Sequence, residues 1–479
     1  MPLSKLQFKP GINREGTNYS NEGGWFDGDK IRFRNGLPER IGGWTRVSNT
    51  QVTGTPRKIF DFVTLDSQNL LFIGTEQKVF LENAGTFNDI TPIRSTVTLG
   101  SNPVNTTGGA GSGVVTITTQ ASHAASTGDF VTLASLTATD GITAAQLNTE
   151  HKIASVPSTT TFTIDTGGSA SSGSTAGGGS SGTAAFQIGV GLNSTVLGAG
   201  WGAGTWGRFT WGSAAGSLSG QTLRLWSVDN FGEDLLFNNM DGSIFYWDAT
   251  NGTSTRGVLL SSLTGASDVP IVARKILVSD VDRHVIVFGT NPIGSVTLDP
   301  LLIRFGSQES LTDFTPSAEN TAGDLRLSKG SEIITAIQTS RQILVFTDQS
   351  LYTMQFLGPP FTFGVSLLGD NIRIAGPNTA IAVNDVVFWM GQENFYLYDG
   401  RIQAIPCSVR DFVFNDMNNQ QSFKFHAGSI GSQTEIWWFY VSSGATEIDR
   451  YVVYNYGQRI WYYGSLVRTA WNDRASGLR

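Results

Sequence analysis

The residues best suited to acid–base, metal or nucleophilic chemistry are few and scattered in this 479-residue chain. Cys407 is its single cysteine, which excludes an internal disulfide framework. There is neither a G-x-S-x-G elbow nor a Walker-type phosphate loop. No second histidine, cysteine or close carboxylate stands at a metal-ligand spacing from any of the four histidines, which are His123, His151, His284 and His426. We therefore expect no metal, no cofactor and no enzymatic activity.

Two pairs of carboxylates are the remaining candidates for chemistry. Asp27 and Asp29 lie in DGD, and Asp280 and Asp282 lie in DVD. Neither pair continues into the ligand ladder and distal glutamate of an EF-hand loop. A turn or a solvated face accounts better for both. Carboxylates that converge only in the folded chain would suit glycoside hydrolysis, so a glycan-binding or glycan-cleaving protein is the alternative function.

The segment KIRFRNGLPERIGGW is the clearest candidate for binding through charge. Lys30, Arg32 and Arg34 alternate with apolar residues, and Arg40 follows a turn. Residues 1–60 carry ten Lys and Arg against five Asp and Glu, although the chain has a net charge of −7. A strand here would show one cationic and one apolar face. It is either an ordinary solvated strand or a strip that docks on an acidic protein partner or on DNA backbone.

The segment WGAGTWGRFTWG spaces three tryptophans five residues apart among glycines. This spacing suits neither a helix nor a strand, so no regular element places Trp201, Trp206 and Trp211 on one side. Glycines let a chain follow a partner closely, and tryptophans supply large contact area at interfaces. We predict that the three rings lie at a subunit contact or near a channel mouth. Burial of each ring in its own sheet is the alternative.

The composition shows which elements must position these residues. Charged residues make up only 15% of the chain, glycine supplies 57 positions and phenylalanine 29. This balance favours many short strands joined by turns over long helices. No run approaches eighteen apolar residues, so no stable membrane insertion is expected. The start MPLSKLQFKPG lacks a signal-peptide core, which favours synthesis in a reducing cytoplasm.

The composition changes at residue 95 and changes back near residue 190. Glycine- and serine-rich segments at 106–113 and 167–185 are typical of flexible linkers. Between them lie alternating strand-like runs and one short helical candidate, Ile142–Asn148. We predict a small β domain at 95–190, inserted between an N-terminal segment with a first blade (1–94) and the remaining blades (191–479).

An aromatic hairpin pattern recurs outside the insert. An apolar strand with a phenylalanine near its end is followed by a turn and a second aromatic strand. The instances lie about fifty residues apart, the period of a four-stranded propeller blade. We predict an all-β fold, a β-propeller of about six blades, with stacked sheets in a sandwich or solenoid as the alternative. The marker residues are Phe72, Phe237, Phe288, Phe346, Phe388 and Phe439.

Several segments are similar to a known family. GINREGTNYSNEGGWFDGDKIRFRNGLPERIGGW resembles the opening of tail-nozzle, or packaged-DNA stabilisation, proteins of short-tailed bacteriophages. The resemblance returns in SQESLTDFTPSAENTAGDLRLSKGSEIITAI and continues through residues 343–400. The glycine–tryptophan segment is similar to a repeated element of those proteins. The insert, with SHAASTGDFVTL and GITAAQLNTEHKIASV, resembles a small β module of phage virion proteins.

The resemblance implies a structural protein of the virion, assembled in the cytoplasm of an infected bacterium. It implies a homo-hexameric ring at the distal end of the tail, below the portal and the adaptor, beside tail fibre or needle proteins. Such a ring retains packaged double-stranded DNA and conducts it during ejection. A mildly acidic body suits a conduit, because each neutralised phosphate would add affinity and friction. A bacterial surface adhesin is a further alternative, which the absence of an export signal disfavours.

Overall fold

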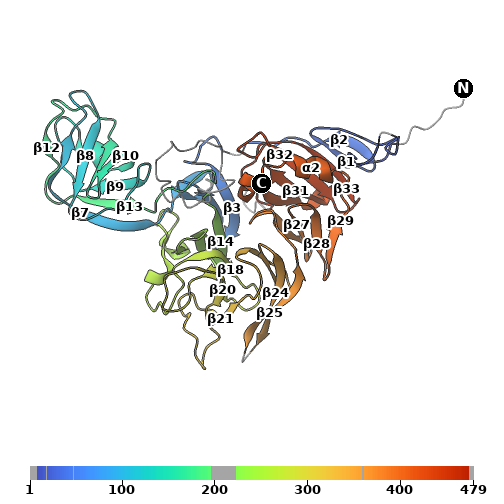
Figure 1. The fold of residues 1–479 in the computed structure, drawn as a ribbon. Coiled ribbons are helices and arrows are strands. Elements are labelled where there is room, and N and C mark those ends of the chain that lie inside the picture. The colour runs from blue at the N-terminus through green and yellow to red at the C-terminus, as the bar shows by residue number, and fades with distance from the viewer. Residues whose placement is uncertain (1–7, 18, 47, 196–222, 359–360, 474–479) are drawn as a thin grey trace, which may run out of the picture.

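Six four-stranded antiparallel sheets form the main body of the protein and confirm the predicted all-β, six-bladed propeller (Figure 1). The computed structural model describes residues 8–17, 19–46, 48–195, 223–358 and 361–473. Each sheet consists of four strands that are consecutive in the sequence. Successive sheets touch chiefly through their first strands, which therefore line the propeller axis.

The blades follow one another in chain order. The first three consist of β3 (Pro56–Val63), β4 (Asn69–Thr75), β5 (Val79–Asn83) and β6 (Thr86–Asp89); β14 (Trp226–Phe231), β15 (Asp234–Asn239), β16 (Ile244–Trp247) and β17 (Val258–Leu259); and β18 (Ala273–Val278), β19 (Val285–Thr290), β20 (Asp299–Phe305) and β21 (Gly323–Arg326). The last three consist of β22 (Ile333–Gln338), β23 (Ile343–Thr347), β24 (Ser350–Gly358) and β25 (Thr362–Asp370); β26 (Ala380–Val383), β27 (Val386–Met390), β28 (Phe395–Tyr398) and β29 (Ile402–Ile405); and β30 (His426–Ile430), β31 (Glu435–Tyr440), β32 (Arg450–Asn455) and β33 (Ile460–Ser465).

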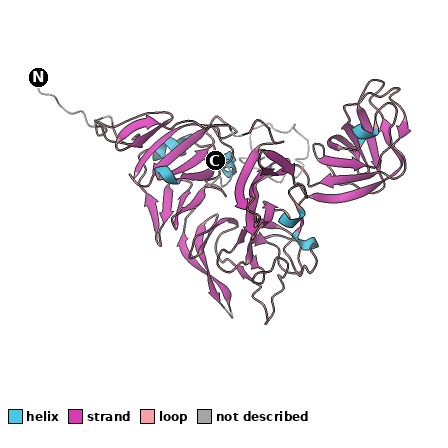
Figure 2. Cartoon of the chain, turned by 180° about the vertical axis from the view of Figure 1, so that it is seen from behind, coloured by secondary structure: helices cyan, strands magenta, loops and turns pink. Residues whose placement is uncertain are grey.

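Helices are short and lie between the strands (Figure 2). The longest in the described chain is α2 (Arg410–Asp416), so no described helix has the length and apolarity to cross a membrane. The 3₁₀ helices are η1 (Ala249–Asn251), η2 (Leu260–Ser262), η3 (Asn419–Lys424) and η4 (Gly431–Gln433).

The six marker phenylalanines explain why the repeat closes into a ring. Each lies on the second strand of its blade and is at most 5% exposed. Phe72 and Phe237 come from adjacent blades, and their ring centroids are 5.5 Å apart. Gly74 allows the closest approach, because a β-carbon there would lie 2.5 Å from the Trp226 ring. Each sheet thus buries one aromatic face against the next, which a single hairpin cannot do in water.

The inserted residues form a small closed barrel. Strand β7 pairs with β13, β13 with β9, β9 with β10, β10 with β11, β11 with β8, and β8 with β7, while β12 extends one edge. Helix α1 (Ala144–Leu147), closed by a capping box of Thr143 and Gln146, confirms the predicted helical segment. The barrel strands are β7 (Ile93–Thr106), β8 (Val114–Thr119), β9 (Phe130–Ala134), β10 (Glu150–Ser158), β11 (Thr161–Asp165), β12 (Ala176–Gly177) and β13 (Thr183–Gln187).

The glycine-rich segments differ from the predicted flexible linkers. Strand β13 lies partly within the second segment and pairs with both β7 and β9. Asp140 accepts hydrogen bonds from the backbone N–H groups of Ser172 and Gly173, at 2.9 and 2.7 Å. Small residues suit this role because Ala170 and Ala184 fill confined positions in the barrel core. A segment rich in glycine and serine can therefore form an ordered edge of the barrel when residues distant in the sequence supply its hydrogen bonds.

An ionic cluster fixes the barrel to the first two blades. Glu150 of the barrel forms ion pairs with Lys78 and with Arg256. Both cations also pair with Asp89, at 2.8 and 3.3 Å. The Phe130 ring covers the Lys78 ammonium at 4.5 Å, so this charge is held between a carboxylate pair and an aromatic face. The barrel projects from one side of the propeller in both views (Figures 1 and 2).

Side chains join the last blade to the first, because the described chain has no sheet that shares strands from its two ends. Arg57 on β3 donates two hydrogen bonds to Glu447, at 2.8 and 2.6 Å. Lys424 pairs with the same carboxylate at 3.2 Å. The side chains of both cations are at most 2% exposed. We call Arg57, Lys424 and Glu447 the ring seam.

Replacing Glu447 by glutamine is expected to open the ring seam, because it leaves two buried cations without their counter-charge. We expect the free energy of unfolding to fall by about 3–5 kcal/mol. Urea denaturation followed by tryptophan fluorescence measures the loss. The control is Arg410→Met, which removes an exposed pair with Asp411 and should cost less than about 1 kcal/mol. Equal losses in the two variants would contradict a special role of the seam.

The ring seam also predicts a dependence on pH. Burial alone would raise the pKa of Glu447, but the hydrogen bonds and charge of Arg57, aided by Ile448 N–H and Lys424, lower it from 4.5 to about 2. The stabilisation is therefore complete above the ordinary pKa and is lost as the pH falls toward 2. We expect the difference in Tm between wild type and Glu447→Gln to shrink across this range. A constant difference would exclude Glu447 as the titrating group.

Candidate functional site

The N-terminal residues 8–46, here called the N-terminal arm, lie along the last blade (Figure 1). Its hairpin consists of β1 (Ile31–Arg34) and β2 (Leu37–Arg40). The backbone N–H of Ile12 donates to Trp461 O at 2.7 Å, and Ser465 N–H donates to Asp29 at 2.7 Å. Since Ile12 is fully buried, the arm is part of the last blade and not a loose tail.

A cationic side chain enclosed by aromatic rings fastens the beginning of the arm. The Arg14 guanidinium lies 4.6 Å from the centroid of Phe26 and 4.4 Å from that of Phe412. It also forms an ion pair with Asp27 at 2.8 Å. Hydrogen bonds from Tyr463 and Arg14 lower the pKa of Asp27 against the effect of burial. The DGD pair predicted as a turn or a solvated face therefore anchors the arm to β33.

The predicted cationic strip is divided by the fold. Arg32 pairs with Glu435 at 3.1 Å, and the Glu435 side chain is only 1% exposed. The arginine therefore serves the chain's own interior, where an unpaired carboxylate would be costly. Lys30, Arg34 and Arg40 are exposed, the first two beside carboxylates of the arm itself. For these three, docking on a partner stays a prediction.

Apolar side chains accompany the exposed cations of the arm. Leu37 is 71% exposed, Phe26 50% and Trp44 46%. A surface that combines arginines with exposed aromatic rings has the composition of a protein interface. The three tryptophans Trp201, Trp206 and Trp211 lie outside the described residues, so their interface role also stays a prediction.

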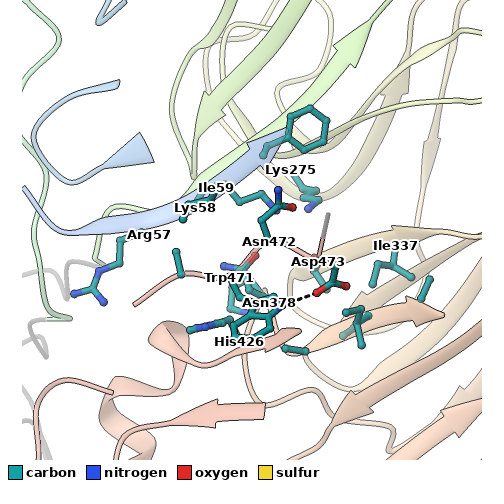
Figure 3. Close-up of a pocket in the computed structure, with 18 of the residues that line it drawn as sticks. Arg57, Lys58, Ile59, Lys275, Ile337, Asn378, His426, Trp471, Asn472 and Asp473 are labelled. Carbon is teal, nitrogen blue, oxygen red and sulfur yellow. Dashed lines mark hydrogen bonds between the residues drawn. The ribbon is translucent and has the colours of Figure 1, made fainter. Parts of the chain in front are cut away.

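The propeller axis contains a cavity of 260 Å³ that is partly open to solvent (Figure 3). First strands of five blades and the C-terminal residues 470–473 line it. Lys58 and Lys275 bring ammonium groups to this cavity, and His426 lies at its edge (Figure 3). Burial lowers the pKa of His426 to about 4, so its imidazole is neutral at pH 7. The cavity is far too small for a nucleic-acid duplex.

Sequence reasoning missed the two axial lysines, although the signal was present. The tripeptide R-K-I occurs at residues 57–59 on β3 and again at 274–276 on β18. In both copies the arginine forms an ion pair with a loop carboxylate of a neighbouring blade, whereas the lysine beside it lines the axis. Because side chains alternate between the two faces of a strand, the arginine and the lysine of each tripeptide point in opposite directions. Their different roles follow once the strand is known to be the innermost of its blade.

The residues examined for catalysis occupy structural positions. His284 is fully buried and contacts the Thr321 hydroxyl at 3.0 Å. His123 stacks on Phe186 in the barrel, with centroids 5.4 Å apart. Burial raises the pKa of the Cys407 thiol far above its ordinary value, which disfavours a reactive thiolate. Across the described ranges, no group of three His, Cys, Asp or Glu side chains could hold a metal ion.

Comparison with known proteins adds little. No protein-family model and no curated protein sequence matches the chain. The phage phi92 endosialidase structure is 10% identical, with a TM-score of 0.22; the match covers 84% of this chain and 55% of that one. The chain thus spans about half the length of that protein.

Two other solved structures are similarly distant. The AfRom2 CNH domain is 11% identical, with a TM-score of 0.30, over 51% of this chain and 72% of that one. A KlHsv2 structure with loop 6CD replaced by a Gly-Ser linker is 8% identical, with a TM-score of 0.23, over 52% and 98%. At these scores none of the three carries an argument about function, and the propeller is assigned from its own strand pairing.

The arm predicts a specific difference between two neighbouring arginines. Arg32→Met leaves Glu435 buried without its partner, which costs about 3–5 kcal/mol and should release the arm. We expect trypsin to cut within residues 8–46 at least about tenfold faster than in wild type, since local opening controls cleavage. Mass spectrometry of the fragments measures the rate. Arg34→Met is the matched control and should leave it unchanged; equal acceleration in both would show that the ion pair does not hold the arm.

Proposed function

We propose that this protein is a non-enzymatic structural component of a bacteriophage virion, the nozzle ring of a short tail. The observation that carries the proposal is the mounting of the N-terminal arm. The segment that resembles the opening of nozzle proteins is fixed along the outer edge of the last blade, and its cations Lys30, Arg34 and Arg40 are exposed. A rigid edge with exposed charge and aromatic rings suits a joint between subunits or with a neighbouring tail protein.

The dimensions of the propeller support a ring of several copies. An axial cavity of 260 Å³, lined by side chains, cannot conduct double-stranded DNA. A conduit must therefore run between subunits, with each propeller as one segment of its wall. The resemblance puts the number of subunits at six. Residues 191–479 carry a net charge of −6, and an acidic wall would keep phosphate contacts and their friction low.

The proposed partners follow from this place in the particle. The ring would contact the adaptor on one side and tail fibre or needle proteins on the other, with phage DNA passing through its centre. The exposed cations would serve the subunit joint, where charge pairing sets the orientation of partners more than the affinity. No cofactor enters this function. The proposed location is the tail of the virion, after assembly in the cytoplasm of the infected host.

Native mass spectrometry and electron microscopy of the purified protein test the proposal. We expect a closed homo-oligomeric ring, six copies in mass, with a central opening wide enough for a duplex. Reversing two charges in the variant Arg34→Glu/Arg40→Glu should weaken the ring at least about tenfold without unfolding the monomer. The matched control is Lys152→Glu, an exposed cation on the barrel.

Two results would contradict the proposal. One is a protein that stays monomeric at concentrations of tens of micromolar, alone and with adaptor. The other is turnover of a bacterial polysaccharide by the purified chain, which would favour the glycan-cleaving alternative.

A further inference from the structure

Two lysines of the axial cavity lack a partner in the described part of the chain. Lys58 and Lys275 take part in none of its hydrogen bonds or ion pairs, although both line the same cavity (Figure 3). Their neighbours differ: Arg57 pairs with Glu447 at 2.6 Å and Arg274 with Asp241 at 2.8 Å. Each ammonium has three donors. Both side chains are half-buried, so each ammonium is partly desolvated, and two such cations facing one cavity without a counter-charge are unfavourable.

The carboxylates at the C-terminal edge of the cavity are already occupied. Asp473 accepts hydrogen bonds from the Ser429 backbone N–H at 2.6 Å, from its hydroxyl at 2.8 Å and from Trp471 Nε1 at 2.7 Å. Asp61 accepts one from the side-chain amide of Asn472 at 2.8 Å. These donors fix the C-terminal residues across β3 and β30. In the described part of the chain, no ion pair joins Asp473 to Lys58, and its charge acts on that lysine only from a distance.

Asp229 is the third acidic group near the lysines. It accepts hydrogen bonds from the backbone N–H groups of Val278 at 2.8 Å and Asn230 at 3.0 Å, and so joins β14 to β18. Burial raises its pKa to about 6, which weakens its value as a permanent counter-ion. Its charge acts on Lys58 and Lys275 without direct contact.

The electrostatics of the lysines agree with a missing partner. Burial lowers the pKa of Lys58, although Asp229 and Asp473 oppose the shift. Burial and the charge of Lys58 together lower the pKa of Lys275 to about 8. The positive charge of Lys58 therefore disfavours the charged form of Lys275. An anion between them would reverse both effects.

We propose that the axial cavity binds a small anion whose carboxylate or phosphate oxygens accept hydrogen bonds from Lys58 and Lys275. The volume of 260 Å³ limits the ligand to the size of a small metabolite or an inorganic oxyanion. Apolar walls from Ile59 and Ile337 and the side chain of Asn378 surround the same space (Figure 3). This site is independent of the proposed ring, because all its residues come from one chain.

Thermal unfolding with and without anions tests the site. Phosphate and malonate serve as probes of the two oxygen chemistries, at an ionic strength held constant with sodium chloride. We expect at least one of them to raise the Tm by about 2 °C or more at a hundred times its Kd. Lys58→Met and Lys275→Met should abolish the rise, and the exposed Lys152→Met should keep it. A rise with phosphate alone assigns a phosphate ligand, and a rise with malonate alone a carboxylate.

The same variants give an opposite result without ligand. Methionine keeps most of the volume of lysine and removes an unpaired, desolvated charge, so the Tm of each variant in chloride should exceed that of wild type. A lower Tm in both variants would mean that the lysines already have stabilising partners. That result would overturn the proposal. So would a wild-type Tm that neither anion raises, or a Tm that an anion raises equally in wild type and in both variants.

Chemical modification provides a readout that does not depend on stability. Acetylation of the wild-type protein near pH 8, followed by peptide mass spectrometry, reports the reactivity of each lysine. The anion that raises the Tm should slow acetylation of Lys58 and Lys275 at least tenfold. Lys152 should react at the same rate with and without it. Equal rates at all three positions would place the anion elsewhere and overturn the assignment.

Discussion

Burial of an aromatic sheet face against the next sheet is the constraint on which the rest of the structure depends. Five of the six contacts form between blades that follow one another in the sequence, although the inserted barrel lies between the first and the second. The sixth has to join the two ends of the chain. Because no described sheet takes strands from both ends, a buried ion cluster of Arg57, Lys424 and Glu447 performs this closure. The N-terminal arm adds to it by completing the outer edge of the last blade.

Cations have three separate uses in this fold. Arg57 and Arg274 join neighbouring blades through carboxylates, Arg32 compensates a buried acid, and Arg34 stays exposed on the arm. Lysines at the axis form a further class, since they line a cavity without an ion-pair partner in the described part of the chain. Several arginines of the described chain, among them Arg57 and Arg274, thus serve structural contacts. The exposed cations outside these structural contacts are the ones available to bind other molecules.

The two proposals concern different scales of the same rigid body. The nozzle proposal concerns the outer edge, where the arm presents charge and aromatic rings. The anion site concerns the axis, which in a propeller is the one place where all blades converge. A ligand at the axis would contact the first strands of several blades and so hold these blades together. This effect does not depend on whether the subunits form a ring. Neither proposal uses catalytic chemistry, and the described histidines and Cys407 serve packing.

Local sequence determined the blades. The recurrence of aromatic hairpins about every fifty residues favours a radial arrangement over stacked sheets, because each marker phenylalanine must find a neighbouring sheet to be buried. The short helix after Thr143 could also be predicted from local sequence, since its capping contact joins residues that are three positions apart. Segments rich in glycine were misleading: composition reports chain flexibility, while the edge of the barrel depends on partners far away in the sequence.

Only the tertiary structure decided how individual charges are used. Alternation along a strand predicted a cationic strip that includes Arg32, but the buried Glu435 that it meets lies 403 residues away. The two R-K-I tripeptides are a second example. Their lysines line one cavity because β3 and β18 both lie at the propeller axis, which the sequence does not show. Periodicity is a property of short segments and can therefore be recognised in the sequence before the fold is known. Electrostatic pairing depends on distances between segments, which no local pattern contains.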